Sequence, residues 1–173
     1  SLAAVANLLP DSGNEPEAIT RRVLSANLRV GRYENAQRLL DYALDTANPD
    51  AMRSEALLCL RDWNRRPFVD RVEGQVRTLS KRDEGLAKRL IEENLSKLFK
   101  MSDGAVLAEL IRLCERLQIK LGTEPLLVIA MSDSQELEAR LQAVKSIESK
   151  GEESIVRSLL DLTKNKQLQI QVT

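Results

Sequence analysis

The feature that most constrains the fold is a series of amphipathic helical segments that recur in a fixed register. In segment after segment the apolar residues follow one helical face, and the second segment of each successive pair aligns on one small or apolar position. The aligned positions are Ala26, Ala56, Leu113 and Ala143. Positions 26 and 56 are 30 residues apart, as are 113 and 143, whereas 56 and 113 are 57 apart. A period of about 30 residues with one insertion of about 27 is typical of a helical solenoid; an irregular helical bundle is the alternative.

The composition also favours an all-α fold. Leu, Ala, Glu, Arg, Lys and Gln dominate, only 3% of the 173 residues are aromatic, and no alternating strand pattern stands between two turn signals. We therefore expect an α-α superhelix that forms a single domain over residues 1–173. Neither end of the chain carries a clear boundary signal, so we expect a fragment of a longer chain.

Charge and residue content restrict the function. Lys and Arg number 26, as do Asp and Glu, so the net charge is zero, which disfavours a dedicated nucleic-acid binder. Because histidine is absent, neither a Ser-His-Asp triad nor a His-containing metal site can form. Cys59 and Cys114 each lie among leucines, which favours buried free thiols over a disulfide. We therefore expect no catalytic residue, cofactor or metal site, no enzyme activity, and, without an apolar run of about 18 residues, no membrane insertion.

Two of the aligned segments resemble HEAT repeats. The mark of these repeats is a turn with Asp or Pro, then an apolar residue, Arg, two variable residues, Ala and a spaced Leu. The segments 48–60 and 139–147 match this pattern, with Arg53 and Arg140 at the arginine position. The other two units carry Val23 and Leu110 there. The expected fold is thus a HEAT-like helical-repeat solenoid with one long irregular inserted loop.

The insertion, residues 64–82, interrupts the helical pattern because Pro67 breaks a helix and Gly74 permits a turn. Its six cations outnumber its two anions, which gives the loop a charge of +4 and leaves −4 for the remaining chain. The cations are Arg65, Arg66, Arg71, Arg77, Lys81 and Arg82, and the anions are Asp70 and Glu73.

Two interpretations of this loop remain open. In the first, the loop is an interaction site for a phosphate, a nucleic-acid backbone or an acidic protein domain. The residues of that site are Arg65, Arg66, Phe68, Arg71, Arg77 and Arg82. The other interpretation, which we favour, is that apolar side chains fix the loop to the helices while Arg71 and Arg77 bond helix C-terminal carbonyls. These apolar residues are Phe68, Val72, Val76 and Leu79, and we expect Trp63 to be buried against them.

One segment carries a further resemblance. The pattern begins with a Trp at the end of a HEAT helix and continues with Pro, Asp-Arg-Val, Gly, Arg-Thr-Leu and Arg-Asp. In this chain it is found at Trp63, Pro67, 70–72, Gly74, 77–79 and 82–83. This segment resembles the HEAT region of large extracytoplasmic dehydrogenase-like proteins of planctomycetes and verrucomicrobia. The resemblance implies a longer protein with a sorbosone-dehydrogenase-like propeller and a c-type cytochrome domain, and an extracytoplasmic location. It assigns none of that chemistry to a residue of this chain, which has no CxxCH motif.

These observations leave two functions. The first is a non-catalytic scaffold or protein-interaction region within a larger dehydrogenase-like, haem-containing protein, whose partner is an adjoining domain or another protein. The alternative is a free-standing helical-repeat protein that binds nucleic acid or phosphate through the basic loop, residues 65–82. Zero net charge and few aromatic residues make nucleic acid the less favoured partner.

Overall fold

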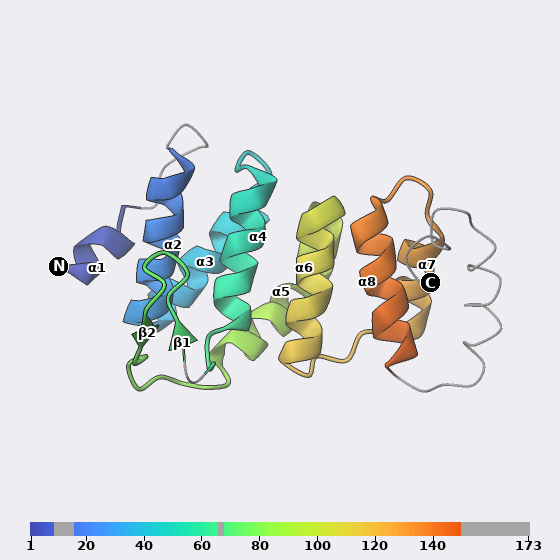
Figure 1. Ribbon diagram of the computed structural model, residues 1–173. Coiled ribbons are helices and arrows are strands. Elements are labelled where there is room, and N and C mark those ends of the chain that lie inside the picture. The colour runs from blue at the N-terminus through green and yellow to red at the C-terminus, as the bar shows by residue number, and fades with distance from the viewer. Residues whose placement is uncertain (9–15, 66–67, 150–173) are drawn as a thin grey trace. The chain divides into compact units, whose positions relative to one another are not determined.

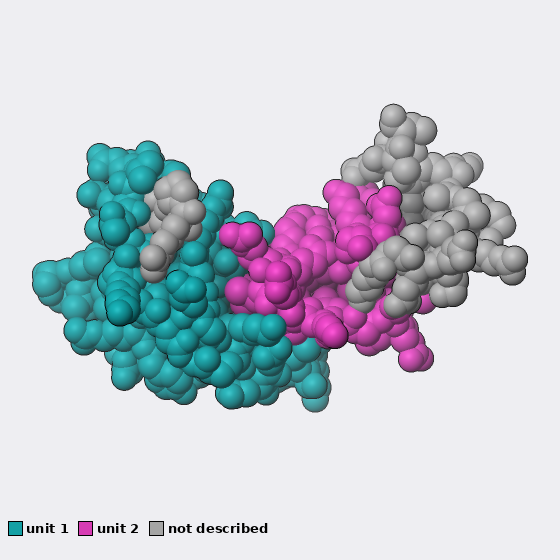
Figure 2. Space-filling view, turned by 90° about the horizontal axis from the view of Figure 1, so that it is seen from below, with its two compact units in different colours: residues 1–101 teal, residues 102–173 magenta. Residues whose placement is uncertain are grey.

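The structure is a computed structural model that describes residues 1–8, 16–65 and 68–149, without the side chain of Phe68. The apolar residues Ile155, Val156, Leu159 and Leu160 predict one more helix, but they lie outside these ranges, as does the loop residue Arg66. The chain divides into two compact units, Ser1–Met101 and Ser102–Thr173 (Figure 2). The described residues form eight helices, so the all-α prediction is confirmed.

Unit 1 contains five helices and one short hairpin (Figure 1). In chain order they are α1 (Leu2–Ala6), α2 (Glu17–Val30), α3 (Tyr33–Leu44), α4 (Asp50–Arg61), β1 (Phe68–Val69), β2 (Val76–Arg77) and α5 (Leu86–Met101). Helix α2 packs against α1, α3 and α4, and α3 packs against α4 and α5. The core of this unit is made of fully buried leucines and alanines on the facing helical stripes, together with Trp63.

Unit 2 contains α6 (Gly104–Arg116), α7 (Thr123–Met131) and α8 (Leu137–Glu148), and α8 packs against both α6 and α7. Its buried residues include Leu110, Ile111 and Ala139, and the two aligned positions Leu113 and Ala143 are both fully buried. Within the described parts of both units, no helix is long and apolar enough to cross a membrane.

The same contacts occur in both units at positions 87 residues apart. The Nε of Arg53 donates to the carbonyl of Ala43 at 3.0 Å, and the Nε of Arg140 donates to the carbonyl of Ala130 at 3.1 Å. Both arginines are 2% exposed. In the preceding turns, the backbone N–H of Asn48 donates to Asp45, and that of Gln135 donates to Ser132, both at 3.2 Å. The buried arginine therefore ties the start of the second helix to the end of the first in α3–α4 and again in α7–α8.

The sequence predicted that the inserted segment is irregular, but part of it is regular: residues 68–77 form a two-stranded antiparallel hairpin. Phe68 pairs with Arg77, and Val69 pairs with Val76. The N–H of Asp70 donates to the carbonyl of Gln75, and that of Gly74 donates to the carbonyl of Asp70. Gly74 has φ = +67°, a left-handed conformation that costs glycine little. Strands of two residues are too short to produce an alternating pattern, which is why the sequence did not reveal them.

Candidate interaction site at the inserted hairpin

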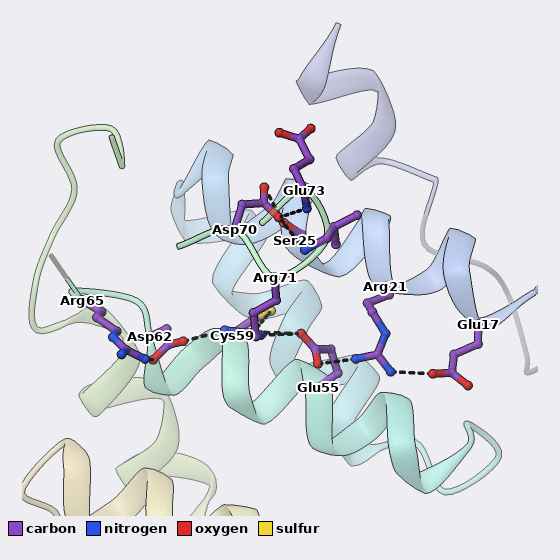
Figure 3. A network of polar contacts seen from close by, with 11 residues as sticks. Glu17, Arg21, Ser25, Glu55, Cys59, Asp62, Arg65, Asp70, Arg71 and Glu73 are labelled. Carbon is purple, nitrogen blue, oxygen red and sulfur yellow. Dashed lines mark hydrogen bonds and ion pairs between the residues drawn. The ribbon is translucent and has the colours of Figure 1, made fainter. Parts of the chain in front are cut away.

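The turn of the hairpin lies over α2 and α4, and polar side chains hold it there (Figure 3). Asp70, at the start of the turn, is 1% exposed. Its Oδ1 accepts hydrogen bonds from the backbone N–H groups of Val72 at 2.9 Å and Glu73 at 3.3 Å. From α2, the hydroxyl of Ser25 donates to both Asp70 oxygens at 3.3 Å. The carboxylate thus closes the turn and binds it to α2.

Arg29, on the last turn of α2, adds a cation to this contact. Its Nη1 lies 3.4 Å from Oδ2 of Asp70 and 3.5 Å from Oε1 of Glu73. One guanidinium therefore faces two carboxylates that are three residues apart in the hairpin turn.

Arg71 provides the corresponding contact with α4. Its Nε and Nη2 donate to Oε1 of Glu55 at 3.1 and 2.8 Å, and its Nη1 donates to Oδ2 of Asp62 at 2.6 Å. The two carboxylates are nearly buried, at 6% and 3% exposure. Glu55 lies on α4 and Asp62 is the residue directly after its last turn; because they are seven residues apart, they face the same side, where a single guanidinium bridges them.

The bridge belongs to a longer chain of alternating charges (Figure 3). Arg21 of α2 donates to Oε2 of Glu55 at 2.8 Å and also contacts Glu17, while Arg65 lies 3.5 Å from Asp62. Three cations and three anions therefore alternate across α2, α4 and the hairpin. They are Glu17, Arg21, Glu55, Arg71, Asp62 and Arg65.

Cys59 lies beneath this bridge, with its Sγ 3.6 Å from Nη2 of Arg71. Burial raises the pKa of the thiol, and this outweighs the lowering effect of Arg71. Burial alone lowers the pKa of a guanidinium, but the negative charges of Glu55 and Asp62 and the hydrogen bond that Arg71 donates to Glu55 raise that of Arg71 overall. The site is thus a protonated thiol under a permanently charged arginine. As the sequence predicted, both cysteines are buried thiols that form no disulfide.

Trp63, just before the insertion, and Arg82, its last residue, hold the C-terminal end of the insertion against unit 1. The Trp63 side chain is fully buried, so its expected burial is confirmed, and its indole N–H donates to the carbonyl of Asp83 at 3.2 Å. The guanidinium of Arg82 lies 4.8 Å from the centre of the Trp63 ring. It donates to the carbonyls of Leu28 at 2.7 Å and Arg29 at 3.3 Å, at the C-terminal end of α2.

Gly31 makes this contact possible. With φ = +70° it ends α2 in a left-handed conformation, and a Cβ at this position would lie 2.4 Å from Cζ of Arg82. A side chain here would therefore strain the backbone and displace the guanidinium.

Two expectations about the loop were wrong. Arg71 and Arg77 bond carboxylates, not helix carbonyls: Arg77 pairs with Glu73 at the surface, with 3.0 Å between Nε and Oε2. Arg82 makes the carbonyl contacts instead, because it follows the hairpin where the chain passes the end of α2. Val76 was expected to pack on the helices but is 70% exposed, whereas Leu79 is buried as expected.

The structure brings Arg65, Arg71 and Asp62 together and places Arg77 and Arg82 in separate contacts. The predicted interaction residues Arg66 and Phe68 lack described side chains. The receiving carboxylates Glu55 and Asp62 were not predicted, although their i, i+7 spacing along α4 and its C-cap was the available signal. No group of His, Cys, Asp and Glu suited to a metal ion occurs among the residues that the structure describes.

No protein-family model, curated protein or solved structure matches the chain.

Proposed function

We propose that the chain is a non-catalytic helical-repeat scaffold that binds other protein domains, and that its basic hairpin is an internal brace. The observation that carries the proposal is that all three guanidinium nitrogens of Arg71 donate hydrogen bonds to Glu55 or Asp62. Arg77 and Arg82 are likewise engaged, by Glu73 and by helix carbonyls. A cation already bonded within its own chain contributes little to a phosphate-binding surface.

We also propose that the helix pairs stack as an α-α superhelix of the HEAT type. Support comes from the arginine–carbonyl contacts of Arg53 and Arg140, 87 residues apart, which equals two periods of about 30 residues plus the insertion of about 27. Solenoids of this kind present extended surfaces to protein partners.

The larger context rests on the sequence resemblance alone. We propose that the chain spaces or docks domains of a longer dehydrogenase-like, haem-containing protein outside the cytoplasm. A CxxCH motif in the flanking sequence and a c-type haem spectrum of the full-length protein are the expected results; a full-length protein without covalent haem would contradict this context.

The brace and the interaction function are tested with one set of variants, Arg71→Gln and Arg77→Gln. We expect Arg71→Gln to destabilise the isolated chain, whereas Arg77→Gln leaves it nearly unchanged, because the Arg77 pair is exposed. In calorimetric titrations of the chain with the remainder of its longer protein, both folded variants should bind like the wild type. Weaker association of both variants, without loss of folding, would show that the hairpin itself is the docking surface.

A second measurement tests the alternative function. Fluorescence anisotropy of a labelled DNA duplex should show only weak association that disappears at physiological salt, since most of the loop charge is neutralised locally. A salt-resistant, submicromolar affinity that falls in Arg77→Gln would contradict the scaffold proposal and establish the nucleic-acid function.

A further inference from the structure

The buried arginine of α8 lacks a contact that its counterpart in α4 makes. In unit 1, Nη2 of Arg53 donates to the carbonyl of Met101, the last residue of α5. In unit 2, Nη2 of Arg140 is buried and has no hydrogen-bond acceptor among the described residues. It lies 3.5 Å from the exposed carboxylate of Asp133, an ion pair without a hydrogen bond. Because a buried donor without an acceptor is costly, we expect an acceptor at this position.

Arg53 shows which kind of acceptor such a nitrogen receives. Its Nε bonds the carbonyl of Ala43 near the C-terminal end of α3, and its Nη2 bonds the C-terminal end of α5, so one guanidinium joins two helix ends. The carbonyls at a helix C-terminus have no partner within their own helix and carry partial negative charge, which suits a cation. In the described part of unit 2, Arg140 holds only the first of these helix ends, that of α7.

Helix α7 also has an apolar side that is open where that of α3 is closed. In unit 1, α5 packs against α3, and Leu40 and Leu44 of α3 are 0% and 9% exposed. Their counterparts at the offset of 87 residues are Leu127, which is half-buried, and Met131, which is 60% exposed. These two residues are four apart and share one helical face. Met131 directly follows Ala130, whose carbonyl binds the buried arginine, so the open apolar side and the unused donor lie at the same helix end.

The sequence that follows α8 has the pattern of the missing helix. After Gly151, the apolar positions 155, 156, 159 and 160 follow one helical face, and Glu152 and Lys164 at the two ends suit the helix dipole. Met101 follows Arg53 by 48 residues. Without the insertion of about 27 residues, the equivalent carbonyl follows the arginine of α8 by about 21 residues and belongs to about residue 161.

The length of this segment fits the distance to be covered. A helix rises about 1.5 Å per residue, so α8 rises about 12 Å between Arg140 and Glu148, and a helix of residues 152–163 is about 18 Å long. A chain that reverses at Gly151 therefore brings the end of such a helix back to the level of Arg140.

We propose that residues 152–163 form a helix that packs along α7 and ends on Arg140, as α5 packs along α3 and ends on Arg53. Its apolar residues cover Leu127 and Met131, and a carbonyl near residue 161 accepts a hydrogen bond from Nη2 of Arg140. This inference deepens the proposed helical-repeat scaffold and rests on it. Its consequence for function is that the chain itself closes the α7 side of unit 2, which is then no surface for a partner protein.

Methionine oxidation tests the proposal on the whole chain. Met131 reacts rapidly with hydrogen peroxide if its side of α7 is open and slowly if a helix covers it, whereas the buried Met52 is an internal reference. The oxidation of each methionine is followed by peptide mass spectrometry. The variant Leu159→Asp places a charge on the apolar face of the proposed helix, and the matched control Ser158→Asp places the same charge on its opposite face.

We expect slow oxidation of Met131 in the wild type and in Ser158→Asp. In Leu159→Asp it should be at least about tenfold faster, because burial of one leucine stabilises the covered state by at least that factor. Met52 should stay protected in all three chains, and unchanged amide signals of α6 show that unit 2 remains folded. If those signals are lost in Leu159→Asp, Leu159→Ala takes its place.

NMR of the wild type identifies the occupant directly. Nuclear Overhauser contacts should join the Met131 methyl group to the methyl groups of Leu159 or Leu160. Further contacts should join the guanidinium of Arg140 to the backbone near residue 161.

Rapid oxidation of Met131 in the wild type, or equal protection in folded Leu159→Asp, would overturn the proposal. So would protection that increases with protein concentration, because a second copy of the chain would then cover α7. Failure of this test together with normal association of the chain with the remainder of its longer protein would refute the helix alone. Loss of that association in calorimetric titrations would refute the scaffold function.

Discussion

Replacing Arg71 with Gln tests the hairpin brace most directly. The substitution removes the guanidinium that bridges Glu55 and Asp62, and it leaves both nearly buried carboxylates in place. Breaking a buried ion pair typically costs 3–5 kcal/mol. Here the cost is smaller, because the Arg71 side chain is 29% exposed and each carboxylate keeps a second cation, Arg21 or Arg65. We therefore expect a loss of about 2–3 kcal/mol in the free energy of unfolding.

The chain contains its own probe for this measurement. Trp63 is the only tryptophan, is fully buried in unit 1, and lies at the base of the insertion. Urea denaturation followed by tryptophan fluorescence therefore reports on this unit. The Arg77→Gln variant is the control, since the Arg77–Glu73 pair is about 40% exposed on both sides, and exposed pairs contribute at most about 1 kcal/mol.

A double-mutant cycle with Glu55→Gln isolates the pairwise interaction. Because Arg71 and Glu55 share two hydrogen bonds, the double variant should be less destabilised than the sum of the two single variants. The brace is refuted if Arg71→Gln costs no more than Arg77→Gln, or if the two single effects simply add.

Two further substitutions and one labelling experiment have defined outcomes. Trp63→Ala should lower the free energy of unfolding by about 3–5 kcal/mol in urea denaturation followed by circular dichroism; an unchanged midpoint would show that the insertion is loosely held. Gly31→Ala should lower the free energy of unfolding by about 1–3 kcal/mol, because φ = +70° and the Arg82 guanidinium both exclude a side chain. Gly74→Ala should lower it less, because no atom lies near a Cβ at that position and only the backbone strain remains. Cys59 and Cys114 should react with a thiol reagent only after denaturation, and rapid labelling of the native chain would contradict their burial.

The helices and their register were predictable because the information is local. Apolar stripes identify a helix from its own residues, and the alignment of Ala56 with Ala143 anticipated two fully buried alanines. The contacts of the insertion were not predictable in the same way. Arg71 meets two acids that belong to a separate helix, so the composition of the loop suggested an excess of positive charge that the folded chain largely neutralises.

The roles of the arginines show the same limit. The sequence predicted that Arg71 and Arg77 bond helix carbonyls, but in the structure Arg82 makes these contacts. The path of the chain past the end of α2 decides which arginine reaches the carbonyls, and that path depends on tertiary contacts. Similarly, Val76 belongs to an apolar set in sequence but points to solvent in a two-residue strand.

The contact of Arg82 with Leu28 spans 54 residues and has a consequence for the order of folding. The α3–α4 pair closes through the Arg53–Ala43 contact over only 10 residues. Short loops close at a smaller entropic cost than long ones. We therefore expect the helix pair to form early and Arg82 to engage α2 in a late step, so that substitution of Arg82 accelerates unfolding more than it slows folding.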